Sequence, residues 1–241
     1  MRIKAEADRL LAMIREGRTM SAGQKVRLAV MLSVPAVVAQ LSSIVMQYID
    51  ASMVGSLGAE ASAAIGLVST TTWLFGGLLS AAASGFSVQV AHRIGAGDWE
   101  GAQRVLRQSV VAVLAFSLLL ASIGAGISSS LPVWLGGAES IHRDASTYFL
   151  IISLFLPALQ MQFLAGGMLR CSGNMHVPSM AGVAMCALDV VFNFLLIFPS
   201  RTVAVAGFDV FLPGAGLGVE GAALGTVLAE TVVVAWLLWY L

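Results

Sequence analysis

Long apolar stretches, separated by short polar or charged segments, alternate along the whole chain. A membrane-spanning helix needs about 20 consecutive, mainly apolar residues. Stretches of this length predict six spanning helices, at about residues 28–54, 61–91, 106–129, 146–169, 178–199 and 217–241. The shorter alternating segments typical of a membrane barrel are absent from the sequence. The pattern therefore predicts an all-α membrane protein, a six-transmembrane-helix bundle.

Composition agrees with a membrane protein and excludes several other classes. Hydrophobic residues make up 58% of the chain and charged residues 11%, whereas soluble domains have about 45–50% and about 25%. The formal net charge of zero argues against nucleic acid as a partner, because its binding proteins have a basic face. The two cysteines, Cys171 and Cys186, form no CxxC motif. Membrane lipid is the first partner that the composition predicts.

The positions of lysine and arginine predict the orientation of the helices. Eleven of them fall in residues 1–27 and in the segments 92–107 and 170–178, whereas Arg143 and Arg201 are the two on the other side. The positive-inside rule then places the N-terminus in the cytoplasm. We expect a multi-pass protein of the inner (plasma) membrane, with a cytoplasmic amphipathic segment over residues 1–27 and a six-span domain over 28–241.

Asp50 is the most unusual residue of the first predicted span, because it is the only charged residue between Arg27 and Glu60. A carboxylate at membrane depth costs roughly 2.5–3.5 kcal/mol. The spacing of Asp50 from three preceding polar residues puts all of them on one helix face; these are Gln40, Ser43 and Gln47. Such a stripe faces protein or a water-filled cavity, although the Gln and Ser residues could instead only join helices by hydrogen bonds. Pro35 is a hinge candidate, or a static kink, in the same helix.

The fifth and sixth spans repeat this feature. Asp189 and Asn193 share a face of the fifth span, and Thr226 and Glu230 share a face of the sixth. No lysine or arginine lies at matching depth, and burial disfavours the charged form of a carboxyl group. These residues have the profile of a proton relay or a cation site. The sequence contains no HExxH or GxSxG motif, so we expect no enzyme, no catalytic residues and no cofactor.

Five sequence strings, in order along the spans, carry a resemblance to a known family. Pro35 and Gln40 precede the first of them, and the strings are "YIDASMVGSLG", "VQVAHRIGAGDWEGAQRV", "LRCSGNMHVP", "DVVFNFLLIF" and "GVEGAALGT". Together they resemble the multidrug and toxic compound extrusion (MATE) family of efflux antiporters. The resemblance implies a twelve-span fold of two six-helix lobes, of which this chain is similar to the N-terminal one. It also implies export of organic-cation or drug-like compounds in exchange for protons or sodium.

The resemblance also implies roles for particular residues. Asp50 falls on the first-span acid, Asp189 and Asn193 on the fifth-span polar pair, and Thr226 on the sixth-span threonine. These four would couple cation or proton movement, with a possible sodium ion at Asp50, Asp189 and Asn193. Gln40, Ser43, Gln47 and Glu230 remain candidates for lining the cavity. The sequence departs from the family pattern at Asp189, where asparagine is usual, at Cys171, where glycine is usual, and at Met175, where threonine is common.

The resemblance implies that a second lobe follows the first, so we expect the chain to be an N-terminal fragment whose partner is a missing C-terminal lobe. A half-size protein that dimerises is the alternative. The nearest rival function is a lipid-linked oligosaccharide flippase of a related family. Such a flippase would need basic residues in its cavity to bind a pyrophosphate, and the predicted membrane interior has none. A membrane enzyme would need clusters of His, Asp or Arg in its loops. A passive structural subunit would leave Asp50, Asp189 and Glu230 unexplained.

Overall fold

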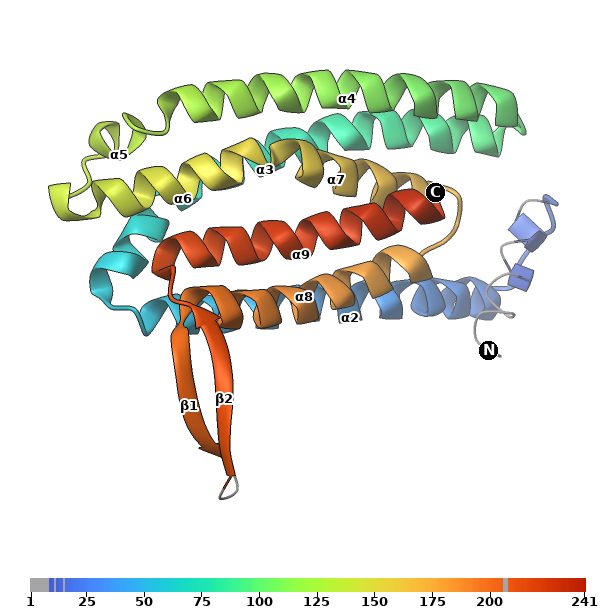
Figure 1. The fold of residues 1–241 in the computed structure, drawn as a ribbon. Helices are drawn as coiled ribbons and strands as arrows, with labels where there is room; N and C mark the ends of the chain where they lie inside the picture. The colour runs from blue at the N-terminus through green and yellow to red at the C-terminus, as the bar shows by residue number, and fades with distance from the viewer. Residues whose placement is uncertain (1–8, 11, 15, 206–207) are drawn as a thin grey trace.

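A computed structural model describes residues 9–10, 12–14, 16–205 and 208–241. Long helices, roughly parallel or antiparallel to one another, form one bundle (Figure 1). They are α2 (Ala22–Gly55), α3 (Ala59–Gly95), α4 (Trp99–Ile127), α6 (His142–Leu154), α7 (Leu156–Cys171), α8 (His176–Ile197) and α9 (Gly218–Tyr240). The short helices α5 (Leu131–Trp134) and η1 (Glu139–Ile141) connect α4 to α6.

The helices agree with six spans. Among the described residues, five helices are long and apolar enough to cross a membrane, and the bent pair formed by η1–α6 and α7 gives a sixth span if the pair is taken as one. Several helices extend beyond the predicted spans. Helix α2 begins at Ala22 rather than near residue 28, because Ser21 and Gln24 form a capping box there. Hydropathy marks the part of a helix that lies in lipid, whereas capping residues mark where the helix ends.

The turn between α3 and α4 shows the same effect. Helix α4 begins at Trp99 rather than near residue 106, because the Oδ1 atom of Asp98 accepts a hydrogen bond from the Gly101 N–H at 2.8 Å. The Nη1 atom of Arg93 lies 2.6 Å from the Oδ2 atom of Asp98. The hydrogen bond from Gly101, followed by the one from Arg93, lowers the pKa of the Asp98 carboxyl group.

The fourth span is broken, whereas the sequence predicted one continuous helix over 146–169. Helices α6 and α7 meet at Phe155 with a bend of 46°. Pro157 lies in the first turn of α7. Its missing N–H removes a hydrogen bond to the preceding turn, which explains the break. By contrast, α2 is continuous through Pro35.

A two-stranded antiparallel hairpin replaces the loop that the sequence predicted around residues 200–216. Strand β1 (Pro199–Val205) pairs with β2 (Phe208–Ala215), with Val203 opposite Val210. Both segments contain β-branched and aromatic residues, which favour strands. The hairpin projects across the direction of the helices (Figure 1). We call the end of the bundle that carries it the hairpin end, and the opposite end, where the C-terminus lies, the terminal end.

The helices pack in two groups that share α9. Helix α9 packs against α8, α7 and α6, while α3 and α4 pack against each other and against α6 and α7. The rings of Phe75 and Phe149 lie 5.9 Å apart in the core between α3 and α6. Helix α2 lies beside α8 at the edge of the bundle (Figure 1), and very little of its apolar stretch is buried by the rest of the chain. It is therefore the spanning helix with the least support from its own bundle.

Part of the predicted amphipathic segment over residues 1–27 lies outside the described residues. Residues 9–10 and 12–14 are helical, and α2 includes the end of the segment from Ala22 onward. Its position in the cytoplasm stays a prediction.

Candidate functional site

Asn193 joins two carboxyl groups from different helices. Its Nδ2 atom donates hydrogen bonds of 3.0 Å to Oδ1 of Asp50 on α2 and of 3.0 Å to Oδ2 of Asp189 on α8. Asp189 and Asn193 are fully buried, and Asp50 is half-buried. The three side chains thus form one compact polar site between α2 and α8.

Two glycines on α9 allow this arrangement. A Cβ atom at Gly225 would overlap Oδ1 of Asn193 and would lie 2.9 Å from its backbone nitrogen. A Cβ atom at Gly221 would lie 2.5 Å from the backbone oxygen of Leu196. Helices α8 and α9 therefore approach closely only because both positions lack a side chain. The spacing Gly221-x-x-x-Gly225 is the small-xxx-small pattern of membrane helix packing, a signal that our sequence analysis missed.

Helix α9 brings two more of the predicted residues toward the site. The hydroxyl of Thr226 faces the carboxyl group of Asp189. Glu230 lies one turn further along α9, is only 8% exposed, and is close enough to Asp189 to interact with it electrostatically. The structure thus brings Asp50, Asp189, Asn193 and Thr226 together, and Glu230 lies next to this group on α9.

The remaining polar residues of the predicted α2 stripe do not join this group. Gln40 and Gln47 are exposed on the surface of the bundle. The hydroxyl of Ser43 donates to the backbone oxygen of Ala39 at 3.2 Å and lies near Cys186 on α8. Of the stripe, only Asp50 reaches the polar site.

Tyr148 is a neighbour of the site that sequence reasoning missed. It lies on α6, packs against apolar clusters on both sides, and is close enough to Asp50 and Asp189 for electrostatic interaction. Tyr148 stands near the start of the fourth predicted span, directly after the polar segment 142–147, so its position resembles that of an ordinary residue at a span end and did not single it out. The structure adds its phenol to the boundary of the site.

The chemistry of the site suits a small cation or a proton. The Oδ1 atoms of Asp189 and Asn193 are buried without a hydrogen-bond partner among the described residues. Oxygen atoms of carboxylates and amides are the ligands that hard cations prefer. Within the described part of the chain, no lysine or arginine forms an ion pair with either aspartate. No group of three or more His, Cys, Asp or Glu residues that could hold a metal ion occurs in the part of the chain that the structure describes.

Fold and site together define a multi-pass helical membrane protein with a buried carboxyl and carboxamide site in its interior. The model of the MatE family matches residues 35–195 of the sequence. The chain belongs to this family. The resemblance stated from the five sequence strings is thereby confirmed, as is the all-α membrane fold.

Several known proteins are similar over most of the chain. The probable multidrug resistance protein NorM of Thermotoga maritima is 22% identical over 201 residues, which are 83% of this chain and 41% of that protein. A MOP superfamily transporter from Pyrococcus furiosus, described as having a binding pocket of reversed polarity, is 25% identical with a TM-score of 0.75, over 87% of this chain and 43% of that one. A MATE structure in the straight conformation is 25% identical with a TM-score of 0.78, over 89% and 44%. The chain therefore spans less than half the length of these relatives.

Proposed function

We propose that this chain is one lobe of an efflux transporter that exports organic-cation or drug-like compounds in exchange for protons or sodium. The observation that carries the proposal is the pair of buried carboxyl groups joined by Asn193. The names of the relatives support it, since one is a probable multidrug resistance protein and another a multidrug resistance MATE family transporter. Because those relatives are about twice as long, we propose that transport needs a second six-helix lobe.

In this proposal the site exchanges one positive charge for the substrate. Two carboxylates joined through one amide repel each other when both are ionised, so a proton or a monovalent cation stabilises the pair. The free oxygen atoms of Asp189 and Asn193 would help to hold a sodium ion. When the cavity opens outward, water and protons reach the half-buried Asp50, and the gain of positive charge there favours release of a cationic substrate.

The position of Asp50 would allow the bound proton or sodium ion to influence the conformation of the lobe. Asp50 lies on α2, which the rest of the bundle buries least, and its carboxyl group is hydrogen-bonded to α8 through Asn193. A ligand shifts a two-state equilibrium only by its differential affinity for the two states. Proton or sodium binding at Asp50 would therefore change how firmly α2 is attached, and would couple the cation to the conformation of the lobe.

The test is efflux of a fluorescent cation such as ethidium from cells or proteoliposomes that contain the chain together with a second lobe. We expect Asp50→Asn to abolish gradient-driven efflux while membrane insertion is unchanged. Asp189→Asn should weaken efflux less, because an amide can still accept the hydrogen bond from Asn193. Glu230→Gln, which keeps the shape of a buried side chain outside the hydrogen-bonded group, is the matched control and should have the smallest effect.

Two results would contradict the proposal. If the Asp50→Asn variant transports as well as the parent at several pH values, with and without sodium, Asp50 is a structural residue. Proton-driven efflux by the 241-residue chain as a monomer would show that no second lobe is needed.

A further inference from the structure

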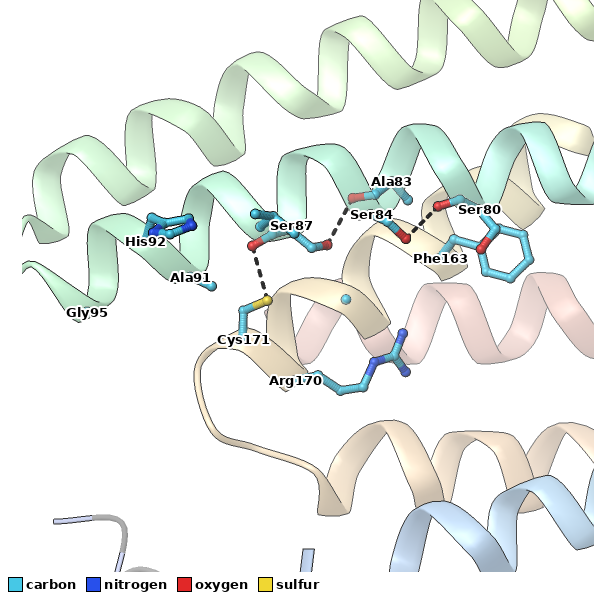
Figure 2. A pocket seen from close by; sticks show the side chains of 12 residues that line it. Ser80, Ala83, Ser84, Ser87, Ala91, His92, Gly95, Phe163, Arg170 and Cys171 are labelled. Atoms are coloured by element: carbon cyan, nitrogen blue, oxygen red, sulfur yellow. Dashed lines mark hydrogen bonds between the residues drawn. The ribbon is translucent and has the colours of Figure 1, made fainter. Parts of the chain in front are cut away.

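A groove lies between α3 and α7, in the half of the bundle next to the terminal end, well away from the carboxyl pair. It has a volume of about 620 Å³. At its outer edge it is lined by His92, Gly95, Arg170 and Cys171, and further into the bundle by serines of α3 and by Phe163 (Figure 2). The groove therefore changes from basic to hydroxyl-lined to apolar as it runs into the membrane.

Arg170 lies in the last turn of α7 and is exposed at the outer edge of the groove. Its side chain runs back along α7 (Figure 2), so that Nη1 would lie 3.4 Å from a Cβ atom placed at Gly166, one turn earlier. The guanidinium group therefore lies close to its own helix. Among the described residues, no carboxylate forms an ion pair with Arg170. The planar guanidinium group matches phosphate oxygens.

Serine hydroxyls of α3 line the groove together with Arg170. The hydroxyl of Ser84 donates to the backbone oxygen of Ser80 at 2.8 Å, and that of Ser87 donates to Ala83 at 2.9 Å. The protons of these hydroxyls are thus used within α3; Ser84 is exposed, whereas Ser87 is buried against Gly167 of α7. The thiol of Cys171 donates to the backbone oxygen of Ser87 at 3.1 Å, which ties the end of α7 to α3 (Figure 2). A phosphate that carries a neighbouring hydroxyl or ammonium group complements this arrangement.

We propose that the groove binds a phosphate-bearing amphiphile, an anionic phospholipid of the leaflet at the terminal end. The phosphate would pair with Arg170, the polar part of the headgroup would meet the serines, and an acyl chain would lie along Phe163 and Val88. The positive-inside rule predicts that this end is cytoplasmic, and the cytoplasmic leaflet carries anionic lipids that bind basic pockets between spanning helices. The proposal concerns binding alone and does not depend on the proposed transport function.

The test is native mass spectrometry of the purified chain in detergent, titrated with phosphatidylglycerol. Diacylglycerol with the same acyl chains, and inorganic phosphate, separate the contributions of the chains and of the anion. We expect saturable binding of phosphatidylglycerol, and binding at least about tenfold weaker for either comparison compound. Arg170→Gln should weaken phosphatidylglycerol binding about tenfold, because charge-assisted bidentate hydrogen bonds are lost. Arg143→Gln removes an equally exposed arginine at the hairpin end and should leave binding unchanged.

A second variant keeps the test decisive if Arg170→Gln does not fold. Ser84→Phe fills the groove from an exposed position while Arg170 is retained, and it should weaken binding as strongly. The proposal is wrong if either groove variant binds phosphatidylglycerol like the parent, or if Arg143→Gln weakens binding equally. Inorganic phosphate that binds as tightly as the lipid would identify a free anion as the ligand. Lipid found on monomers but never on dimers would show that a second copy occupies the groove.

Discussion

Gly225 offers the sharpest test of the packing that forms the polar site. In Gly225→Ala the new Cβ atom would overlap Oδ1 of Asn193, and would lie 2.9 Å from the backbone nitrogen and 3.0 Å from Cγ of the same residue. The Asn193 side chain could rotate away only by giving up its hydrogen bonds to Asp50 and Asp189. Its backbone nitrogen cannot move unless α8 itself shifts. The substitution therefore overpacks the contact between α8 and α9.

Overpacking of a well-packed interior costs about 1–3 kcal/mol. For a chain of this size each kcal/mol corresponds to a change in Tm of roughly 2–4 °C, so Tm should fall by roughly 2–12 °C. The measurement is thermal loss of the helical circular dichroism signal of the detergent-solubilised chain. The matched control is Gly126→Ala on α4, where a Cβ atom meets nothing within 4 Å. Since alanine is favoured over glycine inside a helix by roughly 0.5–1 kcal/mol, the control should be as stable as the parent or slightly more stable.

The reasoning fails if Gly225→Ala melts at the same temperature as Gly126→Ala. That result would mean that α8 and α9 separate without cost, and that the close approach does not hold Asn193 in place. A loss of stability in both variants would point to a general intolerance of alanine at glycine positions, which would equally refute the specific role of Gly225.

Two further predictions concern the surface of the bundle. In a cysteine-free background, a membrane-impermeant maleimide applied to intact cells should label a cysteine that replaces Glu139 but not one that replaces Glu100; the reverse pattern would overturn the predicted orientation. At the turn between α3 and α4, the pKa of Asp98 is lower in the folded state than its usual value of 3.8. The negative charge of Asp98 therefore stabilises the folded state fully when the pH is above 3.8, and this stabilisation is lost as the pH falls through the lower pKa of the folded state. The Tm advantage of the parent over Asp98→Asn, which keeps a capping oxygen, should therefore shrink below about pH 4, and an advantage that grows in acid would contradict the assignment.

The spanning helices could be predicted because hydropathy is a local property of the sequence. The same holds for residues that share one helix, such as Asp189 and Asn193, whose spacing alone puts them on one face. Helix ends were predicted less well, since capping by Ser21 and Asp98 extends α2 and α4 beyond the lipid-facing part. The break at Phe155 could have been expected from Pro157, which we did not use. The hairpin over Pro199–Ala215 could have been suggested by its β-branched residues, but it is only two strands long and forms no part of the bundle.

The candidate site was harder to predict because it depends on which helices pack together. Asp50 and Asn193 are 143 positions apart, and nothing local to either residue identifies the other. The periodicity of α2 predicted four residues on one face, yet Gln40 and Gln47 lie on the exposed surface. A shared face is thus necessary for a shared site and does not ensure one. Tyr148 shows the converse, because it lies beside the carboxyl groups although it belongs to neither of the polar pairs that the sequence singled out.

The glycines of α9 explain how three helices arrive at one polar site. Gly221 and Gly225 let α9 lie against the backbone of α8, which fixes Asn193 next to the helix interface. From there one amide group reaches Asp189 on its own helix and Asp50 on α2. Because α2 packs mainly against α8, the position of Asp50 follows that of α8 and of Asn193, and α8 in turn lies close to α9 at two residues that carry no side chain. The geometry of the carboxyl pair is therefore set from α9, by positions that a search for charged or polar residues would pass over.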